Sequence, residues 1–97
     1  MNLDEKKIKL IKDYFKKKPV LNAFLFGSVV RNQANKDSDI DILIELDYSE
    51  PIGLEFVQMQ LDLQDLLNKK VDLVSVNGLS AHIRPYIEKE KILIYAR

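Results

Sequence analysis

Two aspartates stand two positions apart in the segment Ser38-Asp39-Ile40-Asp41. Apolar and polar residues alternate from residue 39 to residue 46, which predicts a strand. Side chains at positions i and i+2 of a strand point to the same face, about 6–7 Å apart along the backbone. The carboxylates of Asp39 and Asp41 can therefore converge on one or two divalent cations, and Mg²⁺ commonly binds through one or two carboxylates together with substrate phosphates. The simpler alternative is that both aspartates face water at a sheet edge, since aspartate is a poor strand former.

A second candidate feature is the pair Gly27-Ser28, which directly follows the apolar run of residues 20–26. A glycine lets a phosphate group approach the backbone closely, and the free N–H groups at the start of a helix attract anions. Ser28 stands where it would cap a short helix over about residues 29–34, and capping alone would explain it. A phosphate cradle beside a pair of carboxylates is a rarer combination than either feature alone, and it indicates nucleotide chemistry.

A third acidic residue, Asp72, lies within the apolar segment of residues 71–76. A carboxylate in such a strand is costly unless it is paired or bound to a metal ion. An ion pair with Lys69, Lys70 or Arg84 is one alternative. Three carboxylates on adjacent strands could instead hold two metal ions on a triphosphate, an arrangement that activates an attacking hydroxyl and stabilises the leaving pyrophosphate. In that arrangement Asp72 would lie nearest the nucleophile and is the candidate general base.

The elements that must position these residues follow from hydrophobic periodicity and from the glycines and prolines. The sequence predicts strands and helices in alternation, which indicates an α/β (α+β) domain: a small mixed sheet of about four strands with helices packed on it. The predicted strands cover residues 20–26, 39–46, 71–76 and 91–95, and the predicted helices cover residues 3–18, 54–68 and 80–90. We expect residues 1–97 to form a single domain.

Composition narrows the function classes. The 97 residues include no cysteine, which excludes disulfides, zinc–cysteine sites and thiol catalysis. No apolar run approaches the roughly 20 residues of a membrane span, so we expect a cytoplasmic protein without a membrane partner. The net charge is 0, yet residues 1–18 carry +4 and residues 37–65 carry −9. Overall neutrality argues against strong general nucleic-acid binding, and the acidic middle suits divalent cations or a basic partner.

The order of these motifs resembles the signature of the minimal nucleotidyltransferases, a family of the DNA polymerase β superfamily. The family pattern is Gly-Ser-x-Ala-Arg-Gly-x-Ala-Arg-x-x-Ser-Asp-Ile-Asp, and residues 27–41 follow it closely. Residues 71–74 look like the family's third-carboxylate strand, and residues 84–87 with the final strand look like its ending. The resemblance thus covers nearly the whole chain and implies a fold of little more than the catalytic palm.

By this resemblance Asp39, Asp41 and Asp72 are the catalytic residues and ligate Mg²⁺, with two ions expected and Mn²⁺ as an alternative. Family members typically transfer a nucleoside monophosphate from ATP or another nucleoside triphosphate to a hydroxyl group. Many act as the antitoxin of a HEPN-domain toxin, and some inactivate that toxin by adenylylating one of its tyrosines. A HEPN-domain toxin is therefore the expected partner and acceptor.

The resemblance also assigns the residues expected at the nucleotide. Gly27 and Ser28 would contact the nucleotide phosphates, and Arg31 and Ser38 would support the loop or the triphosphate. The Leu-rich helix of residues 54–67 is expected to belong first to the core. A palm of this size also leaves apolar surface for a partner or for a second copy of the chain.

Three positions depart from the family pattern. Asn32 stands in place of the second glycine, Asn35 in place of the second arginine, and Val30 in place of an alanine. Because asparagine tolerates a left-handed backbone, Asn32 is predicted to perform the role of the glycine. The missing arginine removes a bidentate phosphate partner for which Lys36 is only a partial substitute, so we expect activity with weakened triphosphate affinity.

These departures motivate an alternative function, a non-catalytic antitoxin that neutralises its partner by binding and occlusion. An Asp-x-Asp glycosyltransferase is a poorer interpretation, because the chain is too short for a domain that binds a sugar acceptor. His82, the single histidine, is predicted to be a surface or helix-start residue. The tyrosines are predicted to be packing residues, with Tyr48 the one nearest the candidate catalytic strand in sequence.

Overall fold

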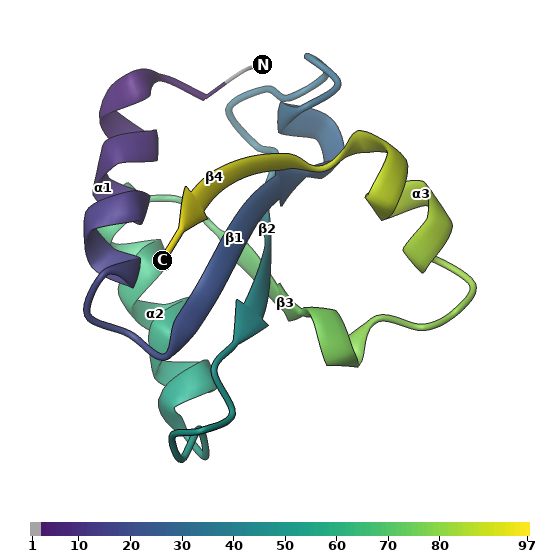
Figure 1. Cartoon of the computed structure of the whole chain (residues 1–97). Helices are drawn as coiled ribbons and strands as arrows, with labels where there is room; N and C mark the ends of the chain where they lie inside the picture. Colours follow the sequence, from purple (N-terminus) through teal and green to yellow (C-terminus); the bar gives the residue numbers. More distant parts are fainter. Residues whose placement is uncertain (1–2) are drawn as a thin grey trace.

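A four-stranded mixed sheet forms the centre of the molecule in the computed structural model, which describes residues 3–97 (Figure 1). The strand order is β3-β2-β1-β4. Strand β1 runs antiparallel to both β2 and β4, and β2 runs parallel to β3. The elements in chain order are α1 (Glu5–Phe15), β1 (Val20–Phe26), η1 (Gly27–Val29), β2 (Ile40–Leu46), α2 (Glu55–Leu67), β3 (Val71–Ser75), η2 (Val76–Gly78), α3 (Arg84–Glu90) and β4 (Ile92–Ala96). The predicted α/β fold with a mixed sheet is confirmed.

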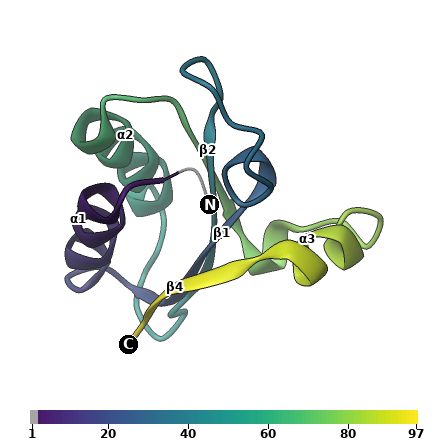
Figure 2. The same ribbon diagram turned by 90° about the horizontal axis from the view of Figure 1, so that it is seen from above.

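Helices α1 and α2 lie side by side on one face of the sheet and enclose the main core (Figure 2). Successive side chains of β2 point to opposite faces of the sheet, as the sequence predicts. Ile40, Ile42 and Ile44 are fully buried under the two helices. Helix α1 contributes Ile11 and Phe15 to this core, and α2 contributes residues from its buried face.

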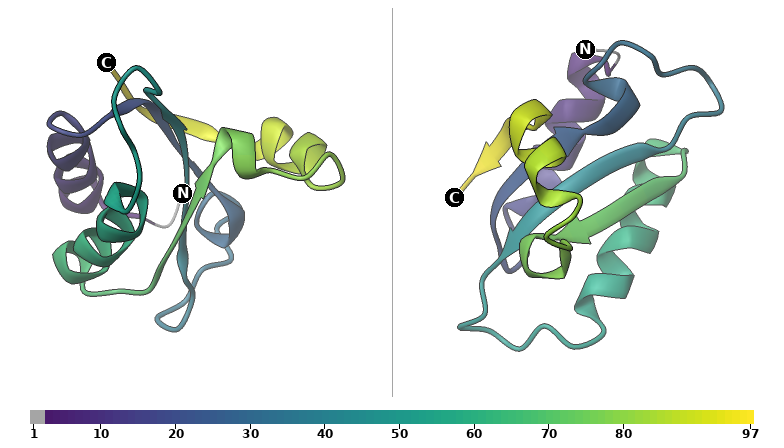
Figure 3. Two further views of the ribbon diagram at one scale, coloured as in Figure 1. Left: turned by 90° about the horizontal axis from the view of Figure 1, so that it is seen from below. Right: turned by 90° about the vertical axis from the view of Figure 1, so that its right-hand side faces the viewer.

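The opposite face of the sheet is covered only in part. Helix α3 and the turn η2 lie on this side, as both views in Figure 3 show. A smaller apolar cluster forms there from Phe26, Leu43, Leu79 and Ile87. Asp41 shares this face with Leu43, because the two residues are two positions apart on β2. The candidate carboxylates therefore face the thinly covered side of the sheet, next to α3.

The orientation of α2 could not be deduced from its sequence. The helix buries Met59, Leu63 and Leu67 against the sheet. The line formed by Leu54, Val57 and Leu61 points outward, and 84% of Leu54 is exposed. Helix α2 is thus a core element on only one of its two apolar faces.

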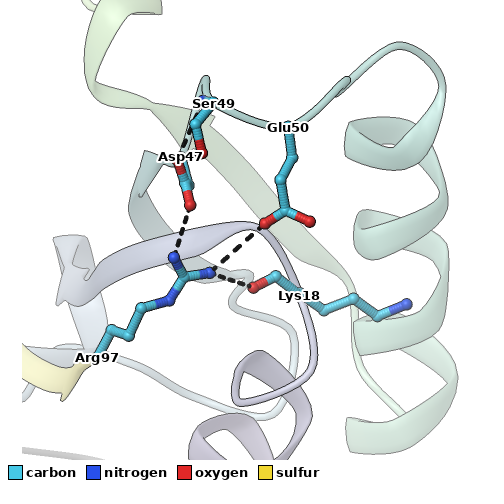
Figure 4. A network of polar contacts seen from close by, with 5 residues as sticks. All are labelled: Lys18, Asp47, Ser49, Glu50 and Arg97. Atoms are coloured by element: carbon cyan, nitrogen blue, oxygen red, sulfur yellow. Dashed lines mark hydrogen bonds and ion pairs between the residues drawn. The ribbon is translucent and has the colours of Figure 1, made fainter.

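A polar network ties the end of the chain to the loop after β2 (Figure 4). The Arg97 guanidinium donates to Asp47 Oδ2 at 2.6 Å and to the Lys18 carbonyl at 3.1 Å, and it lies 3.9 Å from Glu50. Hydrogen bonds from the Ser49 hydroxyl, from Arg97 and from the Ser49 backbone lower the pKa of Asp47 to about 2. The network holds β4 in place at the sheet edge.

Most predicted boundaries agree with the structure within a few residues, with one correction. The predicted helix over residues 29–34 is instead the single 3-10 turn η1, followed by irregular turns. Ser28 does not cap it, because Phe26 holds the N-cap position and no side chain caps the turn. At the N-terminus α1 is shorter than predicted because Asp4 caps it by accepting the Lys7 N–H at 2.8 Å. None of the helices within residues 3–97 is long and apolar enough to cross a membrane.

Candidate active site

The centre of the site is the point where β1 ends and β2 begins. The antiparallel register places Phe26 opposite Asp41, so Gly27 comes directly beside the Asp41 carboxylate. Gly27 has a φ of +79°, and a Cβ on this residue would overlap Asp41 Oδ2. Only glycine therefore fits at position 27, for both conformational and steric reasons. The close approach of this backbone to a carboxylate is the feature from which the rest of the site extends.

A second carboxylate lies beside Asp41 on the neighbouring strand. The parallel register of β2 and β3 pairs Asp41 with Asp72, and paired residues on adjacent strands lie about 4.8 Å apart. Asp39 immediately precedes β2 and is half-buried, as is Asp41. The structure thus pairs Asp41 with Asp72 where the central strand β2 and the edge strand β3 begin, and Asp39 lies one residue before β2.

Asp72 differs from its expected environment. Its side chain is exposed rather than enclosed among the apolar residues of the strand. Two of the three proposed ion-pair partners are engaged elsewhere. Lys69 donates to the Asn35 carbonyl at 3.2 Å, and Arg84 donates to the Val76 carbonyl at 3.0 Å.

The environment of Asp41 disfavours its charge. Burial, the negative charge of Asp72 and the negative charge of Asp39 together raise the pKa of Asp41 to about 6, against a partial opposing effect of Arg31. A carboxyl group under this strain gains from a bound cation, which offsets the repulsion between the acids.

The turn after Gly27 presents backbone donors and a guanidinium. The N–H groups of Val30 and Arg31 both donate to the Gly27 carbonyl, at 3.1 and 3.2 Å, so the N–H groups of Ser28 and Val29 precede the first hydrogen bond of the turn. Such leading N–H groups are available to an anion. Asn32 has a φ of +58°, as its substitution for glycine predicts.

Ser38 belongs to the loop that leads into β2. Its hydroxyl accepts the Asn35 N–H at 3.0 Å, and its own N–H donates to the Asn35 carbonyl at 3.1 Å. These two bonds close the loop just before Asp39. The structure therefore gives Ser38 a loop-supporting contact, one of its two expected roles.

A pocket of about 380 Å³ opens between this turn and α3. Its volume lies within the range of small-molecule sites, about 300–1,000 Å³. Its lining consists of Phe26, Gly27, Arg31, Asp41, Ile83, Tyr86, Ile87 and Glu90. Gly27, Arg31 and Asp41 were predicted as site residues, whereas the contribution of α3 was not.

Two α3 residues that line this pocket were not predicted as site residues from the sequence. Glu90 accepts the Gly27 N–H at 2.8 Å and binds Arg31 at 2.9 Å, although 63 residues separate it from Gly27. Tyr86 is 73% exposed and lines the pocket, whereas Tyr48 is not among the lining residues. Only the approach of α3 to the end of β1 brings Glu90 and Tyr86 to the site, and no local pattern marks either residue.

The acids suit a hard divalent cation that is shared with a phosphate ligand. Within residues 3–97, no group of three or more His, Cys, Asp or Glu side chains is placed to hold a metal ion by itself. Mg²⁺ does not need such a cage, because it usually takes one or two carboxylates and completes its shell with water and substrate phosphates. The paired Asp41 and Asp72, with Asp39 adjacent and the mutual repulsion at Asp41, fit this mode.

Comparison with known proteins gives the family context. The family model described as polymerase beta, nucleotidyltransferase matches residues 9–97. A Methanocaldococcus jannaschii protein provisionally named a protein adenylyltransferase is 42% identical over 90 residues, which are 90% of this chain and 84% of the relative. The protein adenylyltransferase MntA of Thermococcus cleftensis is 38% identical over 71 residues, 72% of this chain and 70% of that protein.

Solved structures share the fold. A structure provisionally described as a minimal nucleotidyltransferase is 29% identical, with a TM-score of 0.74 over 90% of this chain and 87% of that one. A toxin-antitoxin crystal structure with AMP-PNP has a TM-score of 0.75 at 24% identity, over 98% of this chain and 75% of that one. A tri-AMPylated Shewanella oneidensis HEPN toxin in complex with MNT antitoxin has a TM-score of 0.64 at 22% identity, over 95% of this chain and 68% of that one. The last two likenesses concern the fold alone.

Proposed function

Since the chain belongs to the polymerase β nucleotidyltransferase family, we propose that this nucleotidyltransferase transfers AMP from ATP to a hydroxyl group of a HEPN-domain toxin and so acts as its antitoxin. The family membership makes it an enzyme of nucleotidyl transfer. The nucleotide, the acceptor and the residue roles are the proposed part.

The observation that carries the proposal is the contact of Gly27 with Asp41 in the lining of the pocket, together with the pairing of Asp41 with Asp72 on the neighbouring strand. The backbone at Gly27, which only glycine can form, lies against the carboxylate of Asp41, and Asp41 is paired with Asp72 on the neighbouring strand. Phosphoryl-transfer enzymes require these two elements side by side, because backbone donors hold the phosphates while carboxylates hold the cation that bridges them.

In the proposed complex the turn after β1 holds the triphosphate. The N–H groups of Gly27, Ser28 and Val29 and the guanidinium of Arg31 donate to phosphate oxygens. Ser38 keeps the loop before β2 closed, and Asn32 supplies the left-handed residue that the turn needs. Both serve the phosphate site through the backbone.

Asp39, Asp41 and Asp72 would hold Mg²⁺, two ions in the proposed complex, with Mn²⁺ as an alternative ion. When bound, the cation neutralises developing charge on the phosphates and favours the ionised acceptor hydroxyl. The acceptor oxygen forms a bond to the α-phosphorus, and the bond from that phosphorus to the bridging oxygen breaks to release pyrophosphate. Asp72, exposed at the open end of β3, accepts the hydroxyl proton.

The names of the relatives support a toxin protein as the acceptor. Proteins similar to this chain are named protein adenylyltransferases, and a structural neighbour forms a complex with an AMPylated HEPN toxin. Asp72, paired with Asp41, has an exposed side chain, so this part of the site is accessible to a side chain of another protein. We place the reaction in the cytoplasm because the cell's ATP is there.

The test compares two labels of ATP in a lysate of the source cell supplied with Mg²⁺. The wild-type protein is incubated with α-³²P-ATP and, separately, with γ-³²P-ATP. The variant Asp39→Asn/Asp41→Asn removes the proposed ligands, and Asp37→Asn removes a charge from an exposed position of the same loop. We expect one labelled protein with the α label, in the wild type and in Asp37→Asn but not in the double variant.

The outcomes separate the candidate functions. A protein labelled by the γ label alone would indicate phosphoryl transfer and contradict nucleotidyl transfer. Equal labelling by the double variant would contradict the metal-ligand assignment. Absence of labelling, together with full neutralisation of the toxin by the double variant, would favour the non-catalytic antitoxin that acts by occlusion.

A further inference from the structure

Glu90 places a negative charge within the proposed phosphate site. Its Oε1 accepts the Gly27 N–H at 2.8 Å, and both of its carboxylate oxygens lie within 3.3 Å of Arg31 Nη1. These two donors are among those that the proposed function assigns to the triphosphate. The carboxylate of Glu90 thus makes the contacts expected of a phosphate group.

Glu90 lies close to other acidic side chains, and the repulsion between like charges should disfavour this position. Asp41 and Asp72 are paired at this end of the sheet with Asp39 next to them in sequence, and Asp41 lines the same pocket as Glu90. An additional acid is unfavourable in such surroundings unless donors there stabilise an anion strongly. Because Gly27 and Arg31 compensate a carboxylate in the free protein, this corner of the pocket is an anion-binding position.

A triphosphate and Glu90 cannot share these donors. Each backbone N–H carries one hydrogen, and a triphosphate would bring several negative charges next to the Glu90 carboxylate. Glu90 is the last residue of α3, where the chain leaves the helix, and its side chain is 21% exposed. Rotation of the side chain toward solvent therefore frees Gly27 and Arg31 without movement of the sheet.

We infer that Glu90 occupies the position of one phosphate group in the free protein and must leave Gly27 and Arg31 before a nucleoside triphosphate binds. This inference rests on the proposed nucleotide function of the same site. Glu90 then sets the apparent affinity for phosphate ligands, because only the fraction of molecules with Glu90 displaced is competent to bind.

The experiment measures dissociation constants by titration calorimetry for three probes: ATP, inorganic tripolyphosphate and adenosine. Glu90→Ala removes the competing carboxylate, and Glu90→Gln is the isosteric variant in case the alanine protein folds poorly. Glu88→Ala is the matched control, because Glu88 lies on the same helix and pairs with Lys91 outside the pocket.

If Glu90 occupies the site in about nine-tenths of free molecules, its removal tightens binding of ATP and tripolyphosphate about tenfold. Adenosine affinity should stay unchanged in every variant, and Glu88→Ala should stay within about twofold of the wild type because exposed charges are screened. In the Arg31→Ala background the gain from Glu90→Ala should shrink, because the two residues interact directly.

Weaker or equal ATP binding by Glu90→Ala and Glu90→Gln, with normal binding by the wild type, would overturn the inference and leave Glu90 as a residue that holds Arg31 in place. A tenfold gain that Glu88→Ala reproduces would overturn it as well, since general charge would then be the cause. Failure of the wild type and of every variant to bind ATP and tripolyphosphate would overturn the proposed function and this inference together.

Discussion

Asp41→Asn is expected to stabilise the metal-free protein at neutral pH even though it removes a proposed catalytic residue. Asp41 has a pKa of about 6 in the folded chain, against 3.8 for an ordinary aspartate. A raised pKa means that the folded state binds the proton more tightly than the unfolded state does. The stability associated with Asp41 is therefore complete below about pH 4 and is lost as the pH rises through 6.

The size of this effect follows from the shift. About two pH units at 1.36 kcal/mol each give about 3 kcal/mol, which we halve to about 1.5 kcal/mol because the side chain is only half-buried and solvent screens its charge. Asparagine stays neutral at every pH, so the Asp41→Asn variant does not lose this stability as the pH rises. At pH values above 7, this gain should raise the midpoint of thermal unfolding of Asp41→Asn by about 8 °C for a chain of this length.

Urea unfolding in EDTA at pH 4.5, 6.0 and 7.5 measures this difference for the wild type, Asp41→Asn and the control Asp65→Asn, which removes a charge from an exposed position of α2. We expect the advantage of Asp41→Asn to be small at pH 4.5 and full at pH 7.5. A variant less stable than the wild type at pH 7.5, or an advantage that does not change with pH, would refute the reasoning. An equal gain in Asp65→Asn would assign the effect to net charge.

Three further predictions concern the backbone, the polar network and the core. Gly27→Ala is expected to cost about 1–2 kcal/mol from its left-handed conformation, plus the displacement of Asp41, and to abolish AMP transfer; normal transfer would contradict the close approach. The low pKa of Asp47 predicts stability that is present above about pH 4 and falls toward pH 2, so Asp47→Asn should flatten the acid limb in circular dichroism. Leu63→Ala should cost about 3 kcal/mol in urea unfolding, whereas Leu61→Ala on the outer face of α2 should cost under about 1 kcal/mol; similar losses would mean that α2 is rotated.

Local sequence patterns determined most elements and the identity of the chemical groups. The alternation in residues 39–46 placed Ile40 and Ile42 on one face and Asp39 and Asp41 on the other, because the two-residue period of a strand needs no partner to define it. The strand of residues 20–26 was predicted with its exact bounds. The left-handed Asn32 was also predictable, since a turn in this pattern requires a residue that tolerates positive φ.

Local patterns failed where two surfaces were equally apolar or where a helix was short. Helix α2 carries leucines around most of its circumference, so its sequence alone could not show that Leu63 packs inward and Leu61 outward. The residues after Gly27 form only a 3-10 turn, because the chain must reverse there toward β2. The prediction that Asp72 lies in an apolar environment was wrong for a similar reason. Its side chain is exposed, because α3 and η2 cover only part of the sheet face on which it lies.

The sequence by itself therefore determined which groups could do chemistry and on which elements they lie. Only the tertiary structure decided which of them meet. The register of β2 and β3 pairs Asp41 with Asp72, and the packing of α3 brings Glu90 to Gly27 across 63 residues. Such contacts depend on how whole elements pack, because the free energy that selects a register or a docking position is the sum of many distant side-chain contacts that no local pattern contains.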